Sequence, residues 1–450
     1  MTILFANKIH RISILHTNLC KVPKTSKVIF IKNRSSDKTY IRKIRYLPLI
    51  FTIKMLCVLQ FFTSPALTNQ KVSRFLDGLS TTEKKIFKEW HMARSVYDSN
   101  LTAYWQNVEH LHQRRRKKKL IKQPLIDQDY VINLPPKYNG PKLSVELLSL
   151  WQTFRSNNKP IVKLQKHSIP DVDDYLESAK RHYDFVPERI KESEYKRRYA
   201  IEALSYGLTK DQVVRVFALE TGGNGTAIMQ AGVHPIKKTG HPISSALGYA
   251  QLLAANSVNV ISKHGAKFIT RLEQIIKNEH KLKHRKKLQL KLISLRSMYR
   301  TARSIPHQWS KQRALARTSL GMGLHALNID GLIGPWMQVV KLADIKKLAE
   351  RHNLFNISGA KLELMNLAGP GTGLEMMTKV GLDKPTTNFF SRRSYYRNSI
   401  VHQRTSAQLI KEINKRMNVN LKKRGSREFV AIFDKILAGR NDRKNIHKSQ

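Results

Sequence analysis

Apolar residues recur at helical spacing through much of this chain. From Val72 to His112, and again from about residue 165 to 420, apolar positions three and four residues apart alternate with polar ones. This is the pattern of helices that bury one face. The clearest stripe is Leu288, Leu292, Leu295 and Tyr299, at i, i+4, i+7 and i+11. The pattern predicts a mainly α protein in which this stripe packs inward.

Changes in composition divide the chain into segments. A basic helical segment covers residues 67–133, and "LPPKYNGPK" at 134–142 opens a Pro/Gly-containing linker over 134–165. Proline restricts its own backbone and that of the preceding residue away from the helix, so an extended linker is expected there. The main helical domain is predicted over 166–425, and a basic tail over 426–450.

Residues 1–66 carry the order of a secretory signal. Arg42, Lys43 and Arg45 precede an apolar run from Leu47 to Phe62, and the small residues Ser64 and Ala66 follow it. A basic region, an apolar run and small residues in this order indicate export, with cleavage after the small residues. An uncleaved membrane anchor is the alternative, although the run is short and contains a lysine. Location in the periplasm or cell envelope is therefore expected.

The chain is strongly basic. It has 81 Lys plus Arg against 32 Asp plus Glu, a formal net charge of +49. Such a charge balance favours salt-sensitive attraction to polyanions, including nucleic acid, anionic lipid and acidic wall polymers. The alternative is that the lysines and arginines cover the solvated surface of an ordinary fold. No helix-turn-helix, zinc-finger or RNP pattern is present, so no nucleic-acid partner is expected. The run "RRRKKK" at 114–119 is expected to be a solvated tether.

One carboxylate stands where a helix is predicted to end. Thr209 and Gln212 have the spacing of a capping box, which places the helix start near Lys210, and "TGGNG" ends the helix directly after Glu220. The negative end of the helix dipole and partial burial both disfavour the charged carboxylate there and raise its pKa. A raised pKa suits a general acid.

These residues resemble the lytic transglycosylases of the lysozyme-like superfamily. In that family a helix ends at a Glu followed by Ser/Thr-Gly, and a later Ser-x-x-Gly-Leu-Met-Gln-type segment lines the cleft. Here "ETGG" begins at Glu220 and "SALGYAQLL" begins at Ser245, in a second helix predicted to start near Ser244 or Ser245. "MNLAGPGTG", 365 to 373, is similar to the family's Tyr-Asn-Ala-Gly segment. The resemblance implies a lysozyme-like helical catalytic domain with a basic helical N-terminal extension.

The resemblance also assigns roles to single residues. Glu220 corresponds to the catalytic acid and base, and the implied sugar-binding residues are Ser245, Gly248, Tyr249, Gln251 and Asn366. Met365 stands about where the family has a tyrosine, so Tyr249 is the candidate to replace that tyrosine. No cofactor or metal is implied.

The implied reaction is cleavage of the MurNAc-GlcNAc bond of peptidoglycan with a 1,6-anhydromuramyl product. It needs one carboxylate, and no Asp or Glu lies between Thr221 and Leu272, although Asp330 or Glu363 could fold inward. Glycan strands of peptidoglycan are the expected partner, with an anionic membrane or envelope polymer held by basic segments. Two alternatives stay open: a muramidase that uses water, and a non-enzymatic basic protein that binds the cell envelope or nucleic acid.

Overall fold

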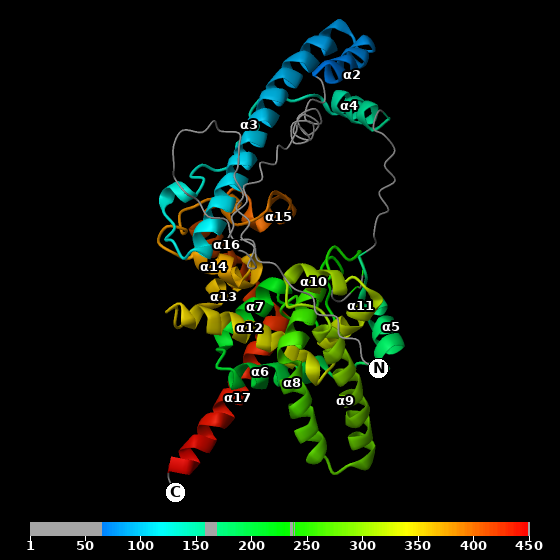
Figure 1. Ribbon diagram of the computed structural model, residues 1–450, viewed down its shortest axis with the longest axis vertical. Helices are drawn as coiled ribbons and strands as arrows, with labels where there is room; N and C mark the ends of the chain where they lie inside the picture. The colour runs from blue at the N-terminus through cyan, green and yellow to red at the C-terminus, as the bar shows by residue number, and fades with distance from the viewer. Residues whose placement is uncertain (1–64, 158–168, 235–236, 238, 449–450) are drawn as a thin grey trace, which may run out of the picture. The chain divides into compact units, whose positions relative to one another are not determined.

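A computed structural model describes residues 65–234, 237 and 239–448, except for 158–168. The predicted signal or anchor segment lies almost wholly outside these residues. The described chain is mainly helical and contains isolated β-bridges but no strand, which confirms the mainly α prediction (Figure 1). None of the described helices is long and apolar enough to cross a membrane.

The helices follow one another with short connections. Their bounds are α2 Pro65–Asp77, α3 Thr81–Leu120, α4 Val145–Asn157, α5 Val172–Tyr183, α6 Glu192–Ser205, α7 Lys210–Glu220, α8 Ala254–Lys277, α9 Leu282–Arg303, α10 Trp309–Leu315, α11 Ser319–His325, α12 Ile333–Arg351, α13 Gly359–Ala368, α14 Pro370–Met376, α15 Arg392–Arg397, α16 Ser406–Leu421 and α17 Arg424–Lys448. Short 3-10 turns lie at Asp127–Asp129, Ala326–Ile329, Thr386–Asn388 and Ser399–Val401. The chain forms two compact units, one from described residues 65–87 and 143–157, the other from 88–142 and 169–448.

The smaller unit is held by aromatic rings. Phe75 of α2 lies 4.8 Å from both Phe87 of α3 and Trp151 of α4, between ring centroids, and Trp151 stacks on Phe154. Residues 145–157 form the helix α4, and this helix places Trp151 and Phe154 in the aromatic cluster. The prediction of a linker over 134–165 is therefore wrong for that part, because its apolar and aromatic residues outweigh the nearby Pro and Gly.

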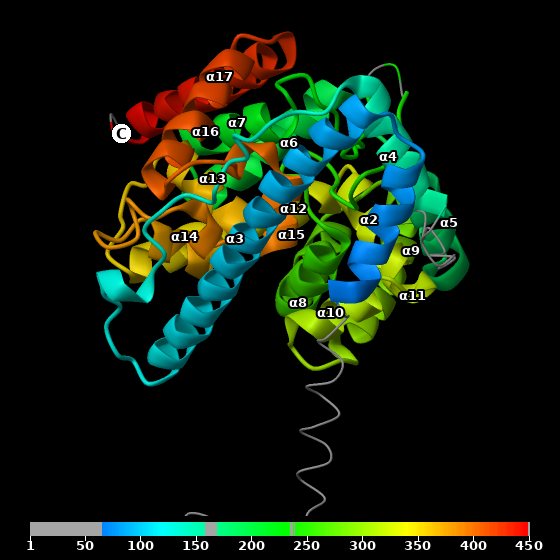
Figure 2. The same cartoon turned by 90° about the horizontal axis from the view of Figure 1, so that it is seen from above.

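The core of the larger unit surrounds α12. Trp336, Met337, Val339 and Leu342 on this helix are at most 3% exposed, and α12 contacts α6, α8 and α13. A helix that is buried almost all round lies in the centre of its unit. The views in Figure 1 and Figure 2 show α6, α7 and α13 close to it.

Segments at both ends of the sequence complete this unit. Leu101 and Trp105 of α3 pack in one apolar cluster with Leu364 of α13 and Tyr395 of α15. At the other end, Phe429 and Phe433 of α17 are fully buried against the main core and Ile436 packs on it, so the predicted solvated tail is wrong for residues 426–436. The prediction separated these segments because their lysines and arginines mask the few apolar residues that anchor them.

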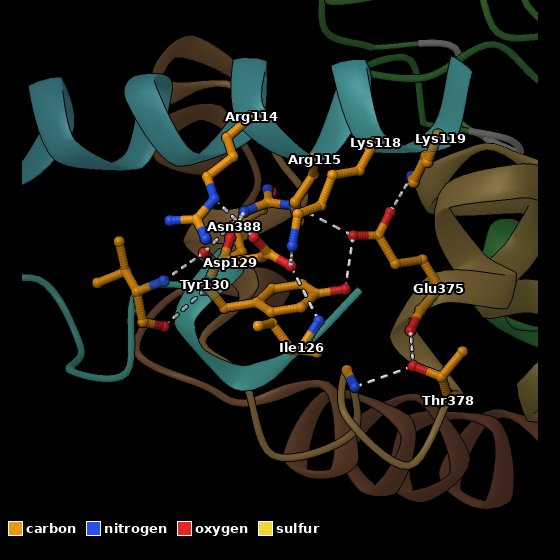
Figure 3. Close-up of polar contacts among 12 residues, drawn as sticks. Arg114, Arg115, Lys118, Lys119, Ile126, Asp129, Tyr130, Glu375, Thr378 and Asn388 are labelled. Atoms are coloured by element: carbon orange, nitrogen blue, oxygen red, sulfur yellow. Dashed lines mark hydrogen bonds and ion pairs between the residues drawn. The ribbon is translucent and has the colours of Figure 1, made fainter. Parts of the chain in front are cut away.

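The basic run 114–119 is also part of the fold. Arg115 is 2% exposed, and its guanidinium donates to the Asp129 carbonyl oxygen at 2.8 Å and pairs with Glu375 at 3.2 Å (Figure 3). Arg114 and Lys118 pair with the fully buried Asp129 at 2.9 and 2.7 Å. The prediction of a solvated tether is wrong, because two buried carboxylates far apart in sequence pair with four of these six cations.

Two predicted helices agree with the structure. In α7 the Thr209 hydroxyl accepts from the Gln212 N–H and the Gln212 side chain accepts from the Thr209 N–H, both at 3.1 Å. The helix runs from Lys210 to Glu220, and Gly222 takes a left-handed φ of 63°. In α9, Leu288 and Leu295 are buried, and Leu292 and Tyr299 pack against them.

The predicted helix near Ser244 does not form. Residues 244–253 are a loop closed by an antiparallel bridge between Leu247 and Leu252, and α8 begins only at Ala254. Gly248 has a φ of 74°, and a Cβ there would lie 2.2 Å from the Gln338 side chain. A left-handed glycine within the run ends any helix, so the loop form prevails.

Candidate functional site

Three helices bring four polar side chains together. Glu220 comes from the last turn of α7, Lys341 from α12, and Glu363 and Asn366 from α13. The Asn366 Nδ2 donates to Glu220 Oε1 at 2.9 Å and lies 3.3 Å from Glu363 Oε2, while its Oδ1 accepts from Lys341 Nζ at 2.6 Å. We call these four residues the Glu220 cluster.

The cluster is held by neighbouring helix geometry. Glu363 and Asn366 are three residues apart, so both point from the same face of α13. That helix packs against α7 and α12, which brings its polar face to the end of α7. Glu363 is 1% exposed, whereas Glu220, Lys341 and Asn366 are partly exposed. Glu220 is therefore the less buried of the two acidic residues.

Burial shifts the pKa of all three ionisable groups. Desolvation raises the pKa of Glu220, and desolvation together with the charge of Glu220 raises the pKa of Glu363 well above its ordinary value of 4.5. Desolvation lowers the pKa of Lys341, against the attraction of both carboxylates. The two carboxyl groups are within hydrogen-bonding reach of each other. Two carboxylates this close hold a proton between them, because both cannot ionise cheaply.

The residues predicted to bind sugar divide into two groups. Asn366 lies on Glu220, as described above. Ser245 and Gln251 are partly exposed but bond to backbone atoms: Ser245 Oγ accepts from the Ala254 N–H at 3.1 Å, and Gln251 Nε2 donates to the carbonyls of Gly248 at 2.8 Å and Met229 at 3.2 Å. Their hydrogen bonds within the described chain hold the 244–253 loop and do not reach Glu220.

Tyr249 is a core residue. It is 1% exposed, its ring lies 4.8 Å from that of Phe217 in α7, and its hydroxyl donates to Glu192 of α6. It can neither stack on a sugar nor replace a tyrosine that contacts Glu220. Gly248 is buried as well, and its lack of a side chain leaves room for Gln338.

Two members of the Glu220 cluster, Glu363 and Lys341, could hardly be assigned to the site from the sequence. Glu363 was one of two remote acids that could fold inward, and its i, i+3 relation to Asn366 was the available clue. Lys341 had no motif at all, being one lysine in a chain with 81 Lys plus Arg. Its place follows only from the packing of α12 against α13.

No protein-family model, curated protein or solved structure matches the chain.

The shared proton predicts how stability depends on pH. Carboxyl groups with a pKa raised above 4.5 keep protons in the folded chain that the unfolded chain releases, so their contribution to stability falls as pH rises above that value. Glu363→Gln removes this loss. We expect the free energy of unfolding of the variant, relative to wild type, to increase between about pH 5 and pH 8.

Urea unfolding at several pH values measures this difference. Glu350→Gln is the matched control, since Glu350 is a partly exposed helix residue whose one ion pair among the described residues is with Lys346 at 3.6 Å. A pH-independent difference for Glu363→Gln would show that the carboxyl groups do not hold an extra proton.

Proposed function

We propose that this protein is a peptidoglycan lytic transglycosylase with Glu220 as its general acid and base. The observation that carries the proposal is a partly exposed Glu at the end of a helix, with a raised pKa and a hydrogen bond from Asn366. Glu220 and Asn366 lie 146 residues apart in sequence, and both were assigned from motifs similar to that family. Their contact supports the assignment of both.

The reaction needs a proton to leave Glu220 and return. The protonated Glu220 gives its proton to the glycosidic oxygen as the bond to the anomeric carbon breaks. The resulting carboxylate takes the proton of the muramyl 6-hydroxyl, whose oxygen bonds to the anomeric carbon and closes the 1,6-anhydro ring. Atoms and charges balance without water, and the tethered nucleophile supplies much of the rate.

The other members of the cluster serve the charged half of this cycle. Once Glu220 has given up its proton, its carboxylate is poorly hydrated. The Asn366 N–H and the nearby Lys341 ammonium stabilise it, and Glu363 lies within hydrogen-bonding reach of it. Lys341 also fixes the orientation of the Asn366 amide, because its Nζ donates to the amide oxygen. These three are positioning residues, since they act through Glu220.

The second carboxyl group does not favour a hydrolase. Inverting glycosidases hold a water between carboxyl groups about 6.5–9.5 Å apart, and retaining ones place them about 5–5.5 Å apart across the sugar. Glu363 lies within hydrogen-bonding reach of Glu220 and is buried behind it. It has neither the separation nor the access to act on the opposite face of a sugar.

This function places the protein at the cell envelope. Its substrate is the glycan strand of peptidoglycan, and the basic, apolar and small residues of positions 42–66 supply the export signal or anchor that such a location requires. The net charge of +49 adds general attraction to acidic envelope polymers. No metal or cofactor takes part in the proposed reaction.

Product analysis tests the proposal. Purified peptidoglycan is incubated with residues 67–450 and with the full chain, and the released fragments are resolved by mass spectrometry. We expect muropeptides ending in 1,6-anhydromuramic acid. Reducing-end products would show a water-using muramidase instead. No release, with the protein still sedimenting with the wall, would leave a non-enzymatic envelope-binding protein.

A further inference from the structure

The outer face of α9 carries exposed aliphatic side chains. Leu282, Leu290 and Ile293 are 70%, 62% and 62% exposed. At 100° per residue they fall within a sector of about 80° on the helix, opposite the buried face of Leu288 and Leu295. They extend along about 16 Å of the helix axis. Solvated helix surfaces do not normally align three large aliphatic residues in this way.

Free cations flank this stripe. Lys283, Lys286 and Lys287 are exposed, and none of them makes an ion pair with another described residue. Two other cations of the helix differ: Lys291 is buried against Asp330 at 2.8 Å, and Arg296 pairs with Glu273 at 2.6 Å. Lys291 and Arg296 are thus neutralised within the fold, whereas Lys283, Lys286 and Lys287 keep their charge at the surface.

The acids nearby do not cancel this charge. Glu279, in the loop between α8 and α9, accepts from the Lys281 backbone N–H and contacts His284, so it is used to hold the loop. Glu273 is the partner of Arg296. Figure 1 shows α8 and α9 side by side with this loop at one end of the pair. Leu282 is the first residue of α9 after the loop.

We propose that this outer face of α9 is a docking surface for an anionic lipid bilayer. Aliphatic side chains enter the boundary between headgroups and acyl chains, while the flanking lysines reach the anionic headgroups with their stems along the apolar surface. Each lysine near such a surface contributes about fivefold in affinity.

The aliphatic stripe decides between a membrane and a nucleic acid. Both polyanions attract lysines, but nucleic acids without sequence preference are held by cations together with aromatic rings that stack on bases. The exposed stripe of α9 contains no aromatic residue, and leucine and isoleucine gain nothing from contact with phosphates. They do gain from burial in lipid. This surface is independent of the Glu220 cluster, so its function does not rest on the transglycosylase activity.

A local probe tests the docking. The environment-sensitive dye NBD is attached through Leu290→Cys in the full chain, with Cys20→Ser and Cys57→Ser removing the native thiols. We expect its emission to increase and shift to the blue with vesicles of phosphatidylglycerol and phosphatidylcholine, and not with phosphatidylcholine alone. The same dye attached through Phe355→Cys is the control, since Phe355 is 65% exposed on another part of the unit.

The local signal separates this surface from the apolar run at 47–62, which can bind lipid by itself. If vesicles sediment the protein while the dye at position 290 stays in water, the proposal is overturned. Lys283→Gln, Lys286→Gln and Lys287→Gln together should weaken the dye response about a hundredfold in lipid concentration. Lys361→Gln, Lys379→Gln and Lys411→Gln, all exposed elsewhere, should change it little. Equal loss in the two sets would show only general charge attraction.

Discussion

Glu220→Gln is expected to lower the rate of anhydromuropeptide release about a thousandfold. Glutamine has the shape of the protonated acid but can neither give a proton to the glycosidic oxygen nor take one from the 6-hydroxyl. General acid and base catalysis contributes about 10²–10⁴-fold in enzymes, and here one group performs both steps. The measurement is the initial rate of muropeptide release from purified peptidoglycan.

The variant should fold as well as the wild type. Its amide oxygen can still accept from Asn366 Nδ2, and it places no charge in the desolvated site, which removes the repulsion that raises the pKa of Glu363. Glu177→Gln is the control, because Glu177 is an exposed helix residue that, within the described part of the chain, pairs with Arg181 alone. Full activity of Glu220→Gln, with unchanged products, would show that Glu220 takes no part in the reaction.

Local sequence rules predicted α7 well. Its capping box, its apolar face and its glycine stop all act within a few residues, so they can be read before any tertiary contact is known. The stripe on α9 is a local signal of the same kind. Both ends of the candidate acid's helix were therefore correct from the sequence alone.

The surroundings of Glu220 could not be read in this way. Glu363 and Lys341 reach it through the packing of α12 and α13, which depends on side chains far apart in sequence. The loop at 244–253 differs from the predicted helix because Gly248 takes a left-handed conformation against Gln338. Tyr249 was assigned to the site from its neighbours in sequence, but it is buried in the core and its hydroxyl donates to Glu192.

The basic run 114–119 shows the same limit for charges. Six consecutive cations look solvated, yet Asp129 and Glu375 are buried next to them, with the Tyr130 hydroxyl donating to Glu375 at 2.9 Å. Whether a cation is free depends on where the acids fold, and Glu375 is 260 positions away from Arg115. Figure 3 shows α3 held to the chain around Glu375 and Asn388 by these contacts.

Arg115→Met is accordingly expected to destabilise the larger unit by about 3 kcal/mol or more. The substitution keeps an apolar stem but leaves Glu375 buried with one cation fewer and removes the donor to the Asp129 carbonyl. Breaking one side of a buried ion pair costs about 3–5 kcal/mol, because the remaining charge stays desolvated. The measurement is the shift of the urea unfolding transition.

The adjacent residue provides the control for this prediction. Arg116 is exposed and makes no ion pair with a described residue, so Arg116→Met should change stability by less than about 0.5 kcal/mol. Arg115→Met combined with Glu375→Gln should recover part of the loss, since the second change removes the unpaired charge. Equal, small effects at positions 115 and 116 would show that the whole run is solvated, as its composition suggests.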